Sequence, residues 1–210
     1  MKLAVLGGSY NPIHIGHLML ADAVCRRYGY DTVAFVPAFL SPFKDGHAGC
    51  TAQDRLKMVE LATADNPAFY CEPCEIHREG VSYTVSTLRY LKQRYPQCEG
   101  KIGLIIGDDL LEGFPRWHQA AVIPEYADLI VGNRFTGLRV PAPDTRCTVQ
   151  QAGDTVQHTS CGTFSYLPVD NAVLPVSSSG IREAIKAKKS WRYLVPSTVY
   201  SYIKEHKLYE

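Results

Sequence analysis

A short apolar run near the start of the chain, Lys2 to Leu6, ends in Gly7-Gly8. Buried strands have this length, and paired glycines allow the backbone to turn tightly. After Pro12, apolar residues recur at the spacing of one helix face until Tyr28-Gly29-Tyr30 closes the segment. The beginning of the chain therefore predicts a strand, a tight turn and a helix, the unit from which parallel sheets are built.

The rest of the chain repeats this alternation. Further strands are expected at Thr32–Pro37, Phe69–His77, Lys101–Ile106 and Ala127–Val131. Helices are expected after a Thr51 cap with Asp54 three residues on, after a cap at Ser82 or Thr84, after Ser177-Ser178-Ser179, and from Pro196 at a first-turn position. The polar segment from Arg139 to Gln157 has no period, which predicts a loop or an irregular hairpin.

This order of elements predicts an α/β fold with a Rossmann-like, doubly wound, mostly parallel sheet flanked by helices. The 210 residues suit one domain, 1–210, that ends in a small helical part at about 177–210. In such folds ligands bind beyond the carboxyl ends of the strands. Gly7-Gly8 and Gly107-Asp108-Asp109 both lie at such ends.

The overall charge excludes several classes of partner. A net charge of +1 and a pI near 7.6 provide no broad basic field for nucleic acid and no polybasic stretch for a membrane surface. The first strand begins without a basic leader, and no apolar run approaches about 18 residues. We therefore expect a cytoplasmic protein that binds neither nucleic acid nor membrane. The sequence leaves a homo-oligomer open.

Seven cysteines are scattered along the chain, and an odd number is a poor disulfide framework. Reduced thiols are the expectation. Cys71, Cys74 and His77 imitate a zinc-ligand spacing, but structural zinc needs a fourth ligand and the chain offers no second paired motif. We therefore favour ordinary strand side chains over a metal site here.

Three stretches place glycines, hydroxyls or cations at strand ends or helix starts: Gly7 to His17, Lys44 in its loop, and Ser177 to Arg182. In the first, glycines let the backbone approach an anion, and the helix that follows offers free N–H groups and a favourable dipole. In the last, hydroxyls, helix-start amides and a guanidinium can grip phosphate oxygens, although a serine-rich start is often just a cap. All three suit phosphate.

His14 and His17 lie three residues apart, so on a helix they share one face and can point at the same polyphosphate. A histidine that merely caps or packs is the alternative, and the glycine turn before the pair favours the ligand-binding interpretation. Neither GxGxxG after the first strand nor GxxxxGK[ST] occurs, which weakens the NAD-oxidoreductase and P-loop hypotheses.

Two motifs in this order resemble a known superfamily. Gly8-Ser9-Tyr10-Asn11-Pro12-Ile13-His14-Ile15-Gly16-His17 is similar to the (T/H)xGH signature of nucleotidyltransferases. Val176-Ser177-Ser178-Ser179-Gly180-Ile181-Arg182 resembles the ISSTxIR segment that accompanies it. The resemblance implies a fold that carries an ATP triphosphate between these two segments.

Four shorter segments extend the resemblance over nearly the whole chain, to the bacterial nicotinate mononucleotide adenylyltransferases of NAD biosynthesis. They are Gly80-Val81-Ser82-Tyr83-Thr84, Gly107-Asp108-Asp109, Phe114-Pro115-Arg116-Trp117 and Tyr193-Leu194-Val195-Pro196. Phosphopantetheine and cytidylyl relatives share the HxGH theme but are not expected to show the SYT and FxxW segments together. The implied reaction moves AMP from ATP to nicotinate mononucleotide.

The resemblance implies a role for each matching position. Its catalytic groups are His14, His17, Lys44 and Arg182. Its ATP-binding positions are Gly7, Gly8, Ser9, Tyr10, Gly16, Gly107, Asp109, Ser178, Ser179 and Ile181. Its acceptor-binding positions are Ser82, Tyr83, Thr84, Trp117 and Arg134. Trp117 would stack on the pyridine ring, and backbone groups around Tyr83 and Thr84 would read its carboxylate. The plain alternatives are a core Trp117 and an Asp108 or Asp109 that merely caps the next turn.

Three positions depart from the family pattern: Asn11 replaces a frequent Asp, Phe43 a frequent His, and Ser86 a frequent Asp. Magnesium is the expected cofactor, bound mainly through ATP phosphates, so no dedicated carboxylate cage is required. Two other functions stay open: an adenylyltransferase that prefers nicotinamide mononucleotide, and a non-catalytic nucleotide sensor. A third, a zinc-bound interaction module, rests only on Cys71, Cys74 and His77.

Overall fold

The computed structural model describes residues 1–40, 49–134, 148–151, 154–157, 159–161 and 164–210, with side chains at 1–40, 49–134 and 164–210. Its main sheet has seven strands in the order β3-β2-β1-β4-β5-β9-β8. The strands are β1 (Leu3–Gly8), β2 (Thr32–Pro37), β3 (Phe69–Cys71), β4 (Ile102–Gly107), β5 (Ala127–Gly132), β8 (Thr159–Cys161) and β9 (Phe164–Val169). Six strands run parallel, and β8 pairs antiparallel with β9. The doubly wound, mostly parallel sheet is confirmed.

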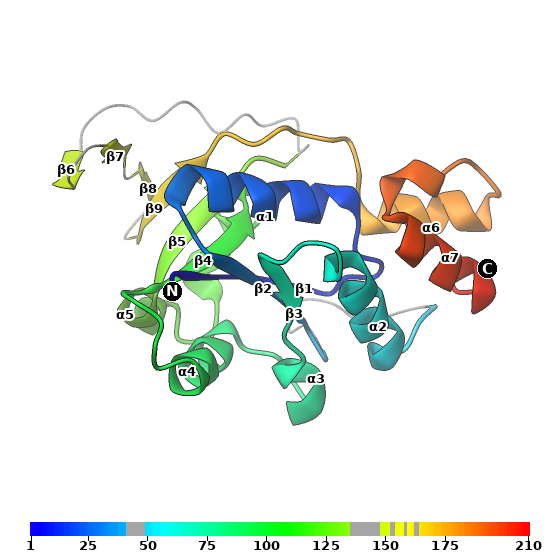
Figure 1. Cartoon of the computed structure of the whole chain (residues 1–210), viewed down its shortest axis with the longest axis horizontal. Helices are drawn as coiled ribbons and strands as arrows, with labels where there is room; N and C mark the ends of the chain where they lie inside the picture. The colour runs from blue at the N-terminus through cyan, green and yellow to red at the C-terminus, as the bar shows by residue number, and fades with distance from the viewer. Residues whose placement is uncertain (41–48, 135–147, 152–153, 158, 162–163) are drawn as a thin grey trace.

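Helices cover both faces of this sheet (Figure 1). They are α1 (Ile15–Tyr28), α2 (Ala52–Thr63), α3 (Cys74–Arg78), α4 (Thr84–Arg94), α5 (Ile123–Tyr126), α6 (Ser178–Lys186) and α7 (Ser197–Glu205). Short 3-10 turns lie at η1 (Asp108–Leu110), η2 (Phe114–Arg116), η3 (Ala120–Val122) and η4 (Arg192–Leu194). In Figure 1, α1 lies along one face, whereas α4 and α5 lie on the other.

The sheet separates two hydrophobic cores, because successive strand side chains point to opposite faces. In β1, Ala4 and Leu6 join the core under α1, α2, α6 and α7. Leu3 and Val5 join the second core, which packs against α3, α4 and α5. All four side chains are almost fully buried. Burial on both faces explains why the strand reads as a continuous apolar run rather than an alternating one.

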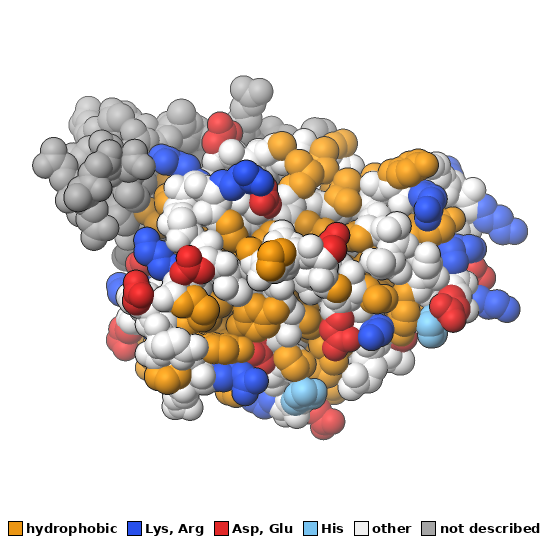
Figure 2. Space-filling view, in the orientation of Figure 1, with side chains coloured by type: hydrophobic (Ala, Val, Ile, Leu, Met, Phe, Trp, Pro, Cys, Tyr) orange, Lys and Arg blue, Asp and Glu red, His pale blue; other side chains and the backbone are white. Residues whose placement is uncertain are grey.

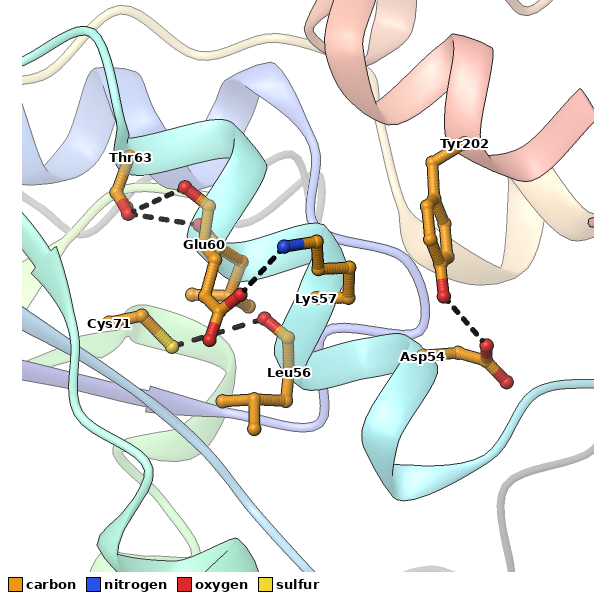
Figure 3. Close-up of polar contacts among 8 residues, drawn as sticks. Asp54, Leu56, Lys57, Glu60, Thr63, Cys71 and Tyr202 are labelled. Carbon is orange, nitrogen blue, oxygen red and sulfur yellow. Dashed lines mark hydrogen bonds and ion pairs between the residues drawn. The ribbon is translucent and has the colours of Figure 1, made fainter. Parts of the chain in front are cut away.

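Helix α2 is fixed at its start by a capping box, as the sequence predicts. The Asp54 N–H donates to the Thr51 hydroxyl over 3.0 Å, and the Thr51 N–H donates to the Asp54 carboxylate over 2.8 Å. The Tyr202 hydroxyl of α7 donates to the other oxygen of that carboxylate over 2.9 Å (Figure 3). The C-terminal helices therefore dock on α2 and share its core.

Several predicted boundaries are corrected by the structure. The strand expected at Phe69–His77 ends at Cys71, and Cys74–Arg78 is helical because Pro73 opens a turn that a strand cannot continue. Neither Ser82 nor Thr84 caps α4, which begins after Tyr83 without a side-chain cap. Pro196 stands at the N-cap of α7, one residue before the first turn.

The polar stretch from Arg139 to Gln157 contains a two-stranded antiparallel pair, β6 (Thr148–Gln151) and β7 (Asp154–Gln157), in agreement with the irregular hairpin expected there. Strand β9 was not predicted. It pairs with β5 inside the main sheet although it contains Pro168, which cannot donate a ladder hydrogen bond.

One face of the surface mixes charges of both signs with apolar atoms, as expected for a net charge near zero (Figure 2). No helix among the described residues is long and apolar enough to cross a membrane. The five cysteines with described side chains are free thiols. In the same part of the chain no three His, Cys, Asp or Glu residues are grouped to hold a metal ion, so Cys71, Cys74 and His77 form no such cluster.

Candidate active site

A cavity of about 620 Å³ opens at the carboxyl ends of β1 and β4. These neighbouring strands lead to opposite sides of the sheet, so this is the position where doubly wound folds bind ligands. We call it the large cavity. It is lined by these predicted ATP-site or catalytic residues: Gly7, Gly8, Ser9, Tyr10, His14, Gly16, His17, Gly107, Asp109, Ser178, Ser179 and Arg182. Segments far apart in the sequence thus meet in one place.

His14 and His17 lie together at the start of α1. His14 is the N-cap of this helix, and its backbone N–H donates to Nδ1 of His17 over 3.2 Å. The two rings stack with centroids 3.7 Å apart. Gly16 lies between them, and a Cβ there would approach the Val176 side chain to 3.0 Å and His14 Nδ1 to 3.2 Å. A side chain at this position would require Val176 or His14 to shift by a few tenths of an ångström.

The His14 residue is 2% exposed, and neither of its ring nitrogens has a hydrogen-bond partner among the described residues. Burial lowers the pKa of His14 to about 3, and the positive charge of Arg134 contributes to the same shift. The ring is therefore neutral at physiological pH and offers one N–H donor. A buried polar atom without a partner that lines a cavity marks a position where a ligand completes the hydrogen bonding.

A second helix start enters the large cavity from α6. The Ser177 side chain caps this helix by accepting from the Gly180 N–H over 3.1 Å. The Ser178 hydroxyl donates to the Pro12 carbonyl over 2.8 Å, and Nη1 of Arg182 donates to the Asn11 carbonyl over 2.7 Å. These bonds attach α6 to the loop that precedes α1. Two sets of first-turn N–H groups therefore converge on one volume.

Asp109 and Arg134 form an ion pair on the wall of the large cavity, with Nη1 of Arg134 2.9 Å from the Asp109 carboxylate. The Arg134 backbone N–H donates to Asp108 over 3.0 Å. Arg134 was expected at the acceptor, but it lines the same cavity as the predicted ATP residues. Gly107 leaves room for this pair, because a Cβ there would overlap both side chains.

A small cavity of about 60 Å³ lies on the opposite face of the sheet and contains Thr84 and Trp117 among its lining residues. Trp117 also packs against Phe114, with ring centroids 5.1 Å apart. Gly7 lines both cavities, as do Ile105, Ile106 and Leu110. The two cavities therefore share a wall at the ends of β1 and β4.

The remaining predicted residues lie apart from both cavities or outside the described part of the chain. Ser82 accepts from the Phe39 N–H over 3.1 Å, and the Tyr83 ring lies 4.3 Å from that of His118. Ile181 is fully buried in the core beneath α6. Lys44 falls within 41–48 and lies outside the described residues.

Sequence reasoning missed two asparagines that line the large cavity, Asn133 and Asn171. The Asn133 N–H donates to Oδ1 of Asn171 over 2.8 Å, and Nδ2 of Asn171 returns a bond to the Asn133 carbonyl over 3.0 Å. Asn133 directly follows β5, so the rule that ligands bind at strand ends points to it. Asn171 follows β9, which the sequence did not reveal.

Comparison of the whole sequence with known proteins shows the family to which the chain belongs. Residues 5–184 match the cytidylyltransferase-like family. A protein of Treponema pallidum (strain Nichols) named "Probable nicotinate-nucleotide adenylyltransferase" is 44% identical over 210 residues, which cover 100% of this chain and 99% of the relative. This chain belongs to the nicotinate-nucleotide adenylyltransferase family. The resemblance seen in the motifs is thereby confirmed, and the chain is a nucleotidyltransferase.

Other relatives share the name at similar coverage. A protein of Enterococcus faecalis (strain ATCC 700802 / V583) is 35% identical over 209 residues, 100% of this chain and 85% of the relative. Among solved structures, the nicotinic acid mononucleotide adenylyltransferase of Plasmodium falciparum complexed with NaAD superposes with a TM-score of 0.70 at 17% identity, covering 99% of this chain and 97% of that one. At that identity the superposition supports the fold alone.

Proposed function

We propose that this chain transfers the AMP part of ATP to nicotinate mononucleotide, giving nicotinate adenine dinucleotide and pyrophosphate in NAD biosynthesis. One observation carries the proposal. The large cavity brings together two helix starts, His17, Arg182 and a neutral His14 whose ring nitrogens have no hydrogen-bond partner among the described residues. This cavity shares a wall with a small cavity lined by Trp117. Relatives that cover the whole chain carry the matching name.

In the proposed reaction a 5′-phosphate oxygen of the mononucleotide attacks the α-phosphorus of ATP. A new phosphorus–oxygen bond forms there as the bond to the β-phosphate oxygen breaks, and that electron pair leaves with pyrophosphate. The attacking phosphate is already largely dianionic at pH 7, because its second pKa is about 6. No side chain has to remove a proton, so positioning and charge stabilisation supply the rate.

The described residues suit this role as hydrogen-bond donors. His14 and His17 act as N–H donors to phosphate oxygens and not as bases. Arg182 adds a fixed positive charge beside the α6 helix start. We propose that Ser178 acts through its backbone N–H, since its hydroxyl proton is donated to Pro12. Removing one such donor costs roughly 3 kcal/mol of transition-state stabilisation in comparable sites.

Magnesium enters this proposal as a metal–ATP complex. Among the described residues no three potential ligands are grouped around a metal position, and the Asp109 carboxylate is paired with Arg134. The donor set at the large cavity is complementary to anions, so phosphate oxygens hold the ion. When bound, the ion neutralises phosphate charge, while the residues of the chain hold the triphosphate in place.

We further propose that residues 1–210 work as one domain in the cytoplasm, where ATP is abundant. The C-terminal helices share a core with α1 and α2, which supports one unit. In the acceptor site, Trp117 stacks on the pyridine ring, and backbone groups at Tyr83 and Thr84 read its carboxylate. Lys44 is proposed as a further cation on the phosphates.

The test is pyrophosphate release from Mg–ATP with nicotinate mononucleotide and, in parallel, with nicotinamide mononucleotide. We expect kcat/KM to favour the acid. A tenfold or greater preference for the amide, about 1.4 kcal/mol, would assign the alternative substrate. Stoichiometric ATP binding in calorimetry without pyrophosphate release from either acceptor would instead identify a nucleotide sensor.

A further inference from the structure

Arg55 carries the only guanidinium that is completely shielded from solvent among the described residues. It projects from α2, and no described carboxylate forms an ion pair with it. Burying a cation is costly unless hydrogen bonds compensate it, and burial lowers the pKa of this group. The free-energy cost of burying this cation must therefore be offset by the hydrogen bonds that it makes.

Among the described residues, the Arg55 side chain donates only to backbone carbonyls of two loops, and its Nε has no partner there. Nη1 donates to the Ser9 carbonyl over 2.8 Å and also to the Ala38 carbonyl. Nη2 donates to the Phe39 carbonyl over 3.0 Å. Ser9 belongs to the loop that follows β1 and lines the large cavity. Ala38 and Phe39 follow β2, which ends at Pro37.

The segment after β2 is in turn hydrogen-bonded to Ser82, the first residue of the proposed acceptor segment, residues 82–84. The Phe39 N–H donates to the Ser82 hydroxyl over 3.1 Å, and the Ser82 N–H donates to the Leu40 carbonyl over 2.9 Å. Ser82 immediately precedes Tyr83 and Thr84 at the start of α4. The Arg55 guanidinium therefore bonds directly to Ser9 of the loop between β1 and α1, which we call the phosphate loop. It is linked to the acceptor segment through Phe39, which bonds to both Arg55 and Ser82.

The helix that carries Arg55 is itself held firmly. The Thr51–Asp54 capping box fixes its first turn, and the Tyr202 hydroxyl bonds to Asp54 (Figure 3). Arg55 is the next residue after Asp54. Met58 and Val59 anchor the following turn in the core. Because α2 is rigid and the guanidinium presents several N–H donors in a fixed geometry, Arg55 is suited to holding two loops at a fixed separation.

We propose that Arg55 is a positioning residue that sets the phosphate loop and the acceptor segment in register, so that the two substrates meet in line. This role rests on the proposed adenylyl transfer. Small misplacements of reacting groups cost large factors in rate, even when each substrate still binds. Arg55 itself lines neither cavity, so its effect is exerted through Ser9 and Ser82.

The experiment compares Arg55→Met and Arg55→Lys with Val59→Ala, a core truncation on the same helix. For each folded protein, kcat and the separate dissociation constants for ATP and for nicotinate mononucleotide are measured at 25 °C. We expect Arg55→Met to lower kcat by at least about tenfold while each dissociation constant changes less than about threefold. Arg55→Lys should recover part of the loss, and Val59→Ala should lower the melting temperature without changing kcat.

If Arg55→Met does not fold, the test uses Arg55→Lys and Ser82→Ala instead. Arg55→Lys weakens the bonds to Ser9, Ala38 and Phe39, and Ser82→Ala removes the bond from the Phe39 N–H. Normal kcat in the folded Arg55 variants of an active enzyme would overturn the positioning role alone. So would a kcat loss no larger than that of Val59→Ala at equal destabilisation. A wild-type protein that releases no pyrophosphate would overturn the proposed function instead, and the positioning role with it.

Discussion

The backbone N–H of His14 donates to Nδ1 of His17, and the two rings stack with centroids 3.7 Å apart. A ring nitrogen that accepts a hydrogen bond carries no proton, so neutral His17 holds its proton on Nε2. The helix start thus fixes the tautomer of a neutral His17, and Nε2–H is the group through which we propose that His17 binds phosphate. This relationship favours a donor role for His17 without requiring an imidazolium.

Replacing His17 should therefore damage the reaction more than the fold. His17→Ala removes the Nε2 donor, and we expect kcat to fall at least about a hundredfold with the folded state retained. His17→Gln places an amide N–H₂ near the position of Nε2 and should recover about tenfold of that loss. Steady-state pyrophosphate release, with circular dichroism as the fold control, measures both. Near-normal turnover in a folded His17→Ala protein would contradict the HxGH assignment.

His14 should make the folded state sensitive to acid. Its pKa is about 3 when folded and 6.5 ordinarily, so between these values the unfolded chain binds a proton that the native state does not. Stability is fully present above pH 6.5 and falls as the pH drops toward 3, by about 2 kcal/mol at pH 5. Urea unfolding at pH 7 and pH 5 measures this change.

His14→Gln is the matched control for that experiment, because it keeps a polar side chain but cannot titrate. The wild-type protein should lose about 2 kcal/mol more than this variant between the two pH values. Parallel losses in the two proteins would show that His14 is not held neutral by burial.

A substitution at Gly7 should lower activity with little effect on stability. A Cβ at Gly7 has nothing within 4 Å, and this residue lines both cavities. Gly7→Ala should leave the free energy of unfolding within about 1 kcal/mol, because no side chain must move. The methyl group would enter the wall between the two cavities, where we propose that the substrates meet, so we expect kcat/KM to fall at least about tenfold. Gly113→Ala, which lines neither cavity, is the control. Equal activity in the two variants would show that a side chain at Gly7 does not interfere with the reaction.

Much of the fold could be predicted because its strands are buried on both faces and its helices carry local signals. Thr32–Pro37 was predicted with its observed bounds, and the Thr51 capping box was read directly from spacing. Strand β9 escaped detection because Pro168 is a local signal against a central strand, and tertiary pairing with β5 overrides it. Cys74–Arg78 is a single helical turn, too short to show a period.

The candidate site, like the fold, has some features that the sequence predicts and others that it does not. The glycine turn and histidine spacing identified the large cavity, since those signals are local in sequence. The partner of Arg134 could not be foreseen, because Asp109 meets it only when β4 and β5 lie side by side. Arg55 gave no signal either, as an arginine at helical spacing resembles any exposed charge until burial is known.

The most direct test of the central claim follows the α-phosphate itself. Wild-type protein is given Mg–ATP that is radioactively labelled at the α-phosphorus, together with nicotinate mononucleotide, and the products are separated by chromatography. We predict that the label appears in nicotinate adenine dinucleotide, in equal amount to the unlabelled pyrophosphate released. Label that stays in ATP, or appears as ADP or AMP without the dinucleotide, would contradict adenylyl transfer by this site.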